Sequence, residues 1–194
     1  RELGDALAAL RARLERLAGD AAGEPAMIPA PRALALLAER LGLSTFEQQT
    51  LLLAAATELD TRVAGLCAAA QRDPGRPFPT WALALVLLDE PTWDALAPGQ
   101  PLRRWRLVDA PAGGGPLTLA PLRADERVVH FLKGLNQLDP RLDAALAPFE
   151  SSFGDTEDDL GERQHGAFLA IRARWQQEEG PPLILLTGPG AEAR

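Results

Sequence analysis

Leucines recur every three or four residues at the start of the chain, which is the spacing of one face of an α-helix. The stripe consists of Leu3, Leu7, Leu10, Leu14 and Leu17. It predicts a helix over about residues 2–18 that packs on its own domain, with oligomerisation or a partner helix as the alternative. Residues 1–30 are therefore interpreted as an amphipathic helix followed by a linker rich in Gly, Ala and Pro.

From residue 31 the apolar positions fall into short groups at helical spacing, and each group follows a helix-start signal. Ser44 and Glu47 have the spacing of a capping box, in which each side chain accepts from the backbone N–H of the other residue. Asp60 and Thr80 are further candidate caps, because short oxygen-bearing side chains satisfy the free N–H groups of a first turn. The helices are expected to start near Pro31, Ser44, Asp60, Thr80 and Pro91.

The pattern changes after residue 102. Residues 103–109 partly alternate between polar and apolar and predict a strand, residues 110–116 form a Gly- and Pro-rich turn, and residues 117–119 predict a second strand. Helices are expected again over residues 125–133 and 140–147. Helices followed by a hairpin and another helix indicate a mainly α, winged-helix-like domain over residues 31–147, in which the hairpin is the wing.

The last part of the chain has the composition of a linker and the start of an α/β domain. Residues 148–160 are acidic and are interpreted as a linker. Within residues 161–194, a helix is expected to about residue 178 and an apolar strand over residues 183–187. This order is that of the first helix and strand of a P-loop ATPase domain.

The residues after that strand resemble a phosphate-binding loop with altered chemistry. Gly188 fits the first glycine of the P-loop pattern, but Ala193 and Arg194 stand at the second glycine and the lysine. Gly188, Pro189 and Gly190 can still form part of a phosphate cradle, and Arg194 can hold a phosphate without supporting hydrolysis. The alternatives are an architectural remnant, which we favour, and a dinucleotide-binding fingerprint read as G-x-G-x-x-A.

Charge and composition narrow the classes of partner. The net charge of −7 does not favour nucleic acid or an anionic membrane surface, and no apolar stretch is long enough to span a membrane. Cys67 is the single cysteine, which fits a reducing cytoplasm. Neither His130 nor His165 has metal-ligand spacing to other residues, so no metal site and no catalytic group are expected.

Several segments together resemble a known family. They are residues 43–47 (LSTFE), 58–60 (ELD), 101–107 (PLRRWRL), 120–123 (APLR) and 125–128 (DERV). They are similar to the winged-helix region ahead of the ATPase domains in a bacterial AAA+ family that occurs with phage-tail-like extracellular contractile injection systems. The resemblance implies a parent ATPase that uses ATP with Mg, forms a hexamer and remodels a protein assembly. This region would be its N-terminal adaptor, and the degenerate loop would not hydrolyse ATP.

We therefore expect a non-catalytic region that binds a protein partner or supports assembly of an ATPase ring, with no cofactor of its own. The expected contact site is the basic and aromatic patch on the wing, formed by Arg103, Arg104, Trp105 and Arg106. The expected recognition helix near residues 91–96 contains no Arg, Lys, Asn or Gln, the residues that read base edges. A DNA-binding winged-helix regulator and a truncated nucleotide-binding enzyme are the alternatives.

Overall fold

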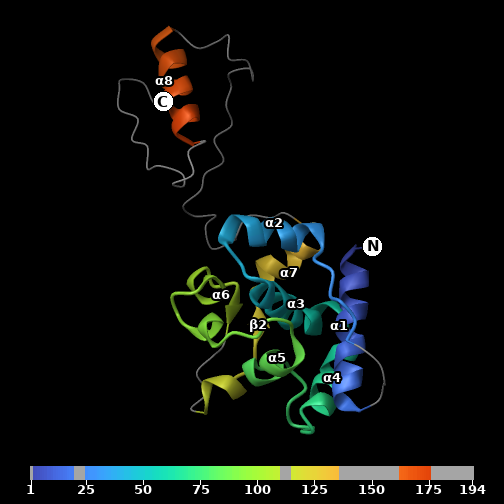
Figure 1. The fold of residues 1–194 in the computed structure, drawn as a ribbon. Coiled ribbons are helices and arrows are strands. Elements are labelled where there is room, and N and C mark those ends of the chain that lie inside the picture. The colour runs from blue at the N-terminus through green and yellow to red at the C-terminus, as the bar shows by residue number, and fades with distance from the viewer. Residues whose placement is uncertain (1, 20–24, 110–114, 136–161, 176–194) are drawn as a thin grey trace. The chain divides into compact units, whose positions relative to one another are not determined.

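The computed structural model describes residues 2–19, 25–109, 115–135 and 162–175. The chain divides into two compact units, residues 1–143 and 144–194. The first unit contains almost all of the described structure (Figure 1). In the second unit the described element is the helix α8 (Glu162–Trp175), which confirms the helix expected after the acidic segment.

The first unit is mainly helical, with two short strands and two turns of 3-10 helix (η). Its elements are, in order, α1 (Glu2–Ala18), α2 (Arg32–Leu41), α3 (Thr45–Leu59), α4 (Arg62–Ala70), α5 (Trp81–Leu87), η1 (Trp93–Leu96), α6 (Pro101–Arg104), β1 (Val108–Asp109), η2 (Leu117–Leu119), β2 (Arg123–Ala124) and α7 (Glu126–Leu132).

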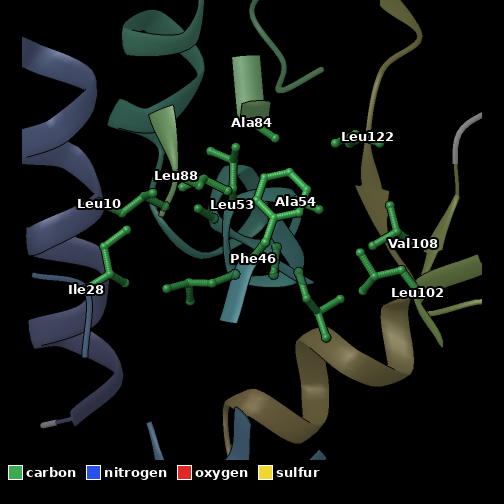
Figure 2. Close-up of a cluster of buried hydrophobic side chains, with 14 of the residues drawn as sticks. Leu10, Ile28, Phe46, Leu53, Ala54, Ala84, Leu88, Leu102, Val108 and Leu122 are labelled. Atoms are coloured by element: carbon green, nitrogen blue, oxygen red, sulfur yellow. The ribbon is translucent and has the colours of Figure 1, made fainter. Parts of the chain in front are cut away.

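Helix α3 is the centre of this unit. It contacts α1, α2, α4, α6, α7 and β2, and its apolar residues are buried on all sides of the helix. Figure 2 shows side chains from several elements meeting around Phe46, among them Leu10 of α1 and Leu102 of α6. The predicted capping box starts the helix: Ser44 Oγ accepts from the Glu47 N–H at 3.3 Å, and Glu47 Oε2 accepts from the Ser44 N–H at 3.0 Å.

Helix α1 packs along α4, as the leucine stripe predicted for a helix that belongs to its own domain (Figure 1). Leu10 and Leu14 are completely buried. An ion pair joins the two helices as well, since Arg11 Nε lies 3.0 Å from Oδ2 of Asp60, immediately before α4. The Asp60 carboxylate also accepts from the Arg62 backbone N–H at 3.1 Å, although the N-cap position of α4 is held by Thr61 and Asp60 ends α3.

The small sheet lies on the other side of α3. Val108 pairs with Ala124 and Asp109 with Arg123 in antiparallel register. An isolated antiparallel bridge between Thr80 and Pro121 extends this small sheet. Next to it, the Leu122 N–H donates to the Pro79 carbonyl at 2.8 Å. Thr80 also caps α5, because its Oγ1 accepts from the Leu83 N–H at 3.1 Å, as predicted.

Of the two predicted strands, residues 103–109 form a strand only at their end, Val108–Asp109, and the strand predicted over residues 117–119 is wrong. Residues 103 and 104 lie in α6, because Pro101 stands at the first helical position and fixes a helical φ. Residues 117–119 form η2, and the strand that pairs with β1 is Arg123–Ala124 instead. The hairpin therefore joins shorter strands than expected, but the order of helices, hairpin and α7 agrees with the predicted winged-helix arrangement.

Other predictions fall outside the described residues. These are the helix over residues 140–147, the acidic linker 148–160, the strand 183–187, and the loop with Gly188, Pro189, Gly190, Ala193 and Arg194.

We expect Asp60 to make the unit less stable at acid pH. Hydrogen bonds from the Arg62 side chain, helped by its backbone N–H and by the charges of Arg62 and Arg11, lower the Asp60 pKa from 3.8 to about 2. Because this pKa is lower in the folded state than in the unfolded state, the stabilisation is present above about pH 4 and is lost as the pH falls toward 2.

Urea unfolding of the wild type and of Asp60→Asn, followed from pH 6 to pH 2.5, measures this contribution. The wild type should be the more stable protein at pH 6, and the difference should shrink as the pH falls. A difference that is independent of pH would show that the Asp60 charge does not stabilise the fold.

Candidate protein-interaction surface

The segment between α5 and the hairpin occupies the position at which a helix-turn-helix protein has its recognition helix. It forms two single turns, η1 and α6, separated by residues 97–100. The helix expected over residues 91–96 is therefore only the 3-10 turn Trp93–Leu96. Arg103 joins the two turns, since its Nη1 donates to the Leu96 carbonyl at 3.0 Å.

Two tryptophans of this segment are exposed. Trp93 in η1 is 64% exposed and Trp105, directly after α6, is 48% exposed, whereas Trp81 is completely buried. Exposed large aromatic side chains are enriched where proteins bind other proteins, because they bury a large area with few rotatable bonds. The contact between η1 and α6 brings the two segments that carry these side chains together.

Arginines accompany the tryptophans. The Arg104 guanidinium lies 5.3 Å from the centre of the Trp105 ring, within the range of a cation–π contact. Arg106 is exposed and has a φ of 51°, a left-handed conformation that is unusual for a residue other than glycine. We call Trp93, Arg104, Trp105 and Arg106 the tryptophan–arginine surface.

The residues of the predicted site lie on a different element from the one expected. Arg103, Arg104, Trp105 and Arg106 precede β1 and belong to α6 and the turn after it, not to a wing strand. Arg103 is partly buried and serves mainly to hold η1 against α6. Trp93 was not among the predicted site residues, because the helix expected over residues 91–96 was considered only as a DNA recognition helix.

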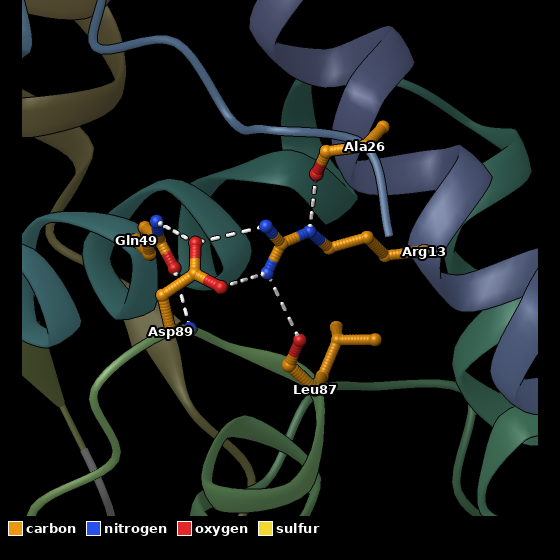
Figure 3. Close-up of polar contacts among 5 residues, drawn as sticks. All are labelled: Arg13, Ala26, Gln49, Leu87 and Asp89. Carbon is orange, nitrogen blue, oxygen red and sulfur yellow. Dashed lines mark hydrogen bonds and ion pairs between the residues drawn. The ribbon is translucent and has the colours of Figure 1, made fainter. Parts of the chain in front are cut away.

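The start of this segment is fixed by a polar cluster that joins distant parts of the chain (Figure 3). Arg13 of α1 binds Asp89 through two hydrogen bonds of 2.8 Å, from Nη1 to Oδ1 and from Nη2 to Oδ2. Gln49 of α3 accepts from the Asp89 N–H at 2.9 Å and donates to Oδ2 at 2.8 Å. Hydrogen bonds from Arg13 and then Gln49 lower the pKa of Asp89 below its usual value.

This cluster holds Asp89 just before η1. Glu90, the next residue, has a φ of 50°, which redirects the chain before Pro91. Arg13 is only 4% exposed and also donates to the carbonyls of Ala26 and Leu87, whereas the Asp89 side chain is 42% exposed. The buried guanidinium is therefore surrounded by acceptors, and the chain entering η1 is positioned from α1 and α3.

The single cysteine is buried, and the side chains that could ligate a metal do not gather into a site within the described part of the chain. Burial raises the pKa of the Cys67 thiol to about 12, so it is not a thiolate at neutral pH. No group of three or more His, Cys, Asp or Glu side chains that could hold a metal ion occurs among the residues that the structure describes. In the same part of the chain, no helix is both long and apolar enough to cross a bilayer.

The protein-family model described as "Winged helix domain, variant" matches residues 1–146 of the chain. This range includes α1, which lies outside the winged-helix boundaries expected from the sequence. The comparisons with curated proteins and with solved structures returned no match.

Replacing either partner of the Arg13–Asp89 pair should destabilise the first unit, and the two replacements should differ in cost. Asp89→Ala leaves the buried Arg13 charge without a counter-charge and is expected to cost roughly 3 kcal/mol of unfolding free energy. Arg13→Met leaves behind a carboxylate that is partly in water, and should cost about 2 kcal/mol. The double variant should cost less than the sum.

Chemical denaturation of the three variants measures these values. Arg76→Gln is the matched control, because its pair with Asp73 is partly exposed on both sides and should contribute less than about 1 kcal/mol. Additive costs for Arg13 and Asp89 would contradict a direct coupling between them.

Proposed function

The chain belongs to the variant winged-helix domain family, and we propose that it acts as a non-catalytic protein-interaction domain. The observation that carries this proposal is the tryptophan–arginine surface, which presents two exposed indole rings where a DNA-binding relative would present a recognition helix. A large aromatic side chain buried by a partner, with arginine beside it, is the usual composition of an interface hot spot.

The shape of the segment argues against reading DNA in the major groove. A recognition helix presents three or four side chains to successive base edges from a continuous helix. Here α6 contains four residues and η1 four, so each provides about one turn. Neither turn is long enough to present such a row.

The charge of the first unit also argues against binding duplex DNA. Residues 1–143 contain 16 Lys and Arg against 18 Asp and Glu, and residues 144–194 contain 4 against 9. The winged-helix unit is therefore slightly negative by itself, and most of the chain's negative charge comes from the second unit. Duplex DNA binding depends on neutralising many phosphates, for which this unit has no excess of positive charge.

The second part of the proposal concerns the ATPase to which this domain would belong. The segments quoted above resemble the region ahead of the ATPase domains in a bacterial AAA+ family of contractile injection systems, and the loop with Gly188 and Arg194 resembles a P-loop without its lysine. We propose that this domain is the adaptor of such an ATPase, recruiting its protein substrate or supporting the ring. ATP and Mg would act in an intact ATPase module of the parent protein.

The second candidate function is DNA binding, which the winged-helix family membership favours. Arg104 and Arg106 could contact phosphates from the same surface. Both functions would use the same residues, so the type of ligand retained by the protein distinguishes them.

We predict that Trp93→Ala/Trp105→Ala leaves the fold intact and abolishes partner binding. Both side chains are largely exposed, so the melting temperature should change little. Losing two aromatic anchors of about 2 kcal/mol each, about 4 kcal/mol together, should weaken binding by roughly 700-fold. Quantitative affinity capture from cells of the source organism, with wild type and double variant side by side, measures the loss.

Val86→Ala is the matched control, because Val86 is an exposed apolar residue on α5, outside the tryptophan–arginine surface. A random 30-base-pair duplex, tested by anisotropy at two salt concentrations, is the competing ligand. Salt-sensitive duplex binding that is lost in Arg104→Gln/Arg106→Gln, without any captured protein, would replace the proposal by the DNA-binding alternative.

We also predict that the chain does not hydrolyse ATP. Ala193 and Arg194 replace the glycine that allows the close backbone turn and the lysine that contacts the β- and γ-phosphates. Phosphate release from ATP with Mg should remain at the buffer rate. Turnover that disappears on Gly188→Val would contradict the assignment of a degenerate loop.

A further inference from the structure

We propose that the partner segment bound by the tryptophan–arginine surface is an acidic peptide that also carries apolar side chains. This inference rests on the proposed function and names the chemistry of its ligand. Carboxylates would bind Arg104 and Arg106, and apolar side chains would cover the rings of Trp93 and Trp105.

The first argument is the pairing of the arginines. In the same unit, Arg11, Arg13, Arg62, Arg76 and Arg127 each form an ion pair with an aspartate. Arg104 and Arg106 have no such pair within the described residues; both are exposed, and Arg104 lies beside the Trp105 ring. Two exposed guanidinium groups that follow each other closely in the chain, one of them beside an indole ring, are complementary to carboxylates flanked by apolar groups.

The second argument is the geometry of Arg104. Its guanidinium carbon lies 5.3 Å from the centre of the Trp105 ring, so the cation is held beside an aromatic surface. A guanidinium can donate two parallel hydrogen bonds to one carboxylate. The contact with the ring restrains the Arg104 side chain, which lowers the entropic cost of binding.

The third argument is the backbone at Arg106. The turn after α6 is closed by bonds from the Arg106 N–H to the Arg103 carbonyl (3.1 Å) and from the Leu107 N–H to the Leu102 carbonyl (2.9 Å). This places Arg106, at a φ of 51°, in a position that usually holds glycine. An arginine there costs on the order of 1 kcal/mol in backbone strain. Arg72, after α4, has the same backbone and is exposed as well, so the turn fixes where the Arg106 side chain leaves the chain but does not assign it a role.

A nucleic acid is the less suitable ligand for the same surface. Single strands also stack bases on tryptophan and bind arginine through phosphates. However, Glu90 and Asp94 flank Trp93 in the same segment, and they would repel a chain that carries a negative charge at every nucleotide. A peptide can place its few carboxylates at the arginines alone.

The test uses the whole chain and a fluorescein-labelled 12-residue peptide that alternates glutamate with leucine. Fluorescence anisotropy should show saturable binding that weakens with salt, and at least tenfold weaker binding of the peptides in which lysine or glutamine replaces glutamate. Arg104→Gln and Trp105→Ala should each weaken binding at least fivefold. Arg40→Gln is the matched control, since Arg40 is exposed on α2 and has no ion pair within the described residues.

Arg106→Gly separates binding from folding. Glycine relieves the strained φ, so thermal stability should stay the same or rise, while affinity for the glutamate–leucine peptide falls at least fivefold. An unchanged affinity would show that the Arg106 side chain has no role, and would overturn the inference at this residue.

Other outcomes distinguish this inference from the proposed function. If the lysine–leucine peptide binds more tightly and Trp105→Ala abolishes that binding, the surface still binds proteins but the acidic ligand class is wrong. If a 12-nucleotide poly-dT strand binds more tightly than every peptide, both the inference and the proposed function fail. Absence of binding by the glutamate–leucine peptide up to millimolar concentration overturns the inference as well.

Discussion

The first unit depends on the enclosure of α3. Its residues from Phe46 to Ala56 are mostly apolar around the whole helix, so no side of it can face water without a large cost. Five helices and β2 cover it, and this requirement determines where each of them lies. Helix α1 is part of that cover together with α4, which explains why the family match begins at residue 1 and not at the helix expected near residue 31.

The cluster of Arg13, Gln49 and Asp89 joins α1 and α3 to the chain just before η1. It thereby positions the segment that carries the tryptophan–arginine surface. A buried guanidinium is costly unless acceptors surround it, and here Asp89 supplies two of the four acceptor atoms. Because Asp89 lies only four residues before Trp93, the same contacts that satisfy Arg13 also fix the path into η1. At the other end, the pairing of β1 with β2 fixes the chain after Arg106. The segment is therefore held at both ends.

The sequence predicted the features that depend on neighbouring residues. Helix α1, the Ser44–Glu47 box and the Thr80 cap follow from local spacing and local hydrogen bonds, and all three were confirmed. The strand predicted over residues 103–109 is confirmed only at Val108–Asp109, because Pro101 starts a helical turn that takes up residues 103 and 104 in spite of their partial strand-like alternation. Nothing local connects Arg13 with Asp89, since that contact exists only after α1, α3 and α5 have packed. The tryptophan–arginine surface was partly predicted, because Arg104 and Trp105 are adjacent, whereas the exposure of Trp93 depends on the tertiary fold.

The segment between α5 and β1 is divided into two turns, η1 and α6, and this division favours the proposed function. Residues 97–100 (Ala-Pro-Gly-Gln) together with Pro101 prevent one continuous helix, because a proline cannot continue a helix through its missing N–H and its ring. The break removes the row of side chains that a major groove requires, and it turns Trp93 and Trp105 outward from separate short elements. A broken, well-anchored segment with exposed rings, whose Arg104 and Arg106 form no ion pair within the described residues, is poorly suited to a regular duplex. It is suited to a peptide, whose side chains can meet rings and cations at irregular spacing.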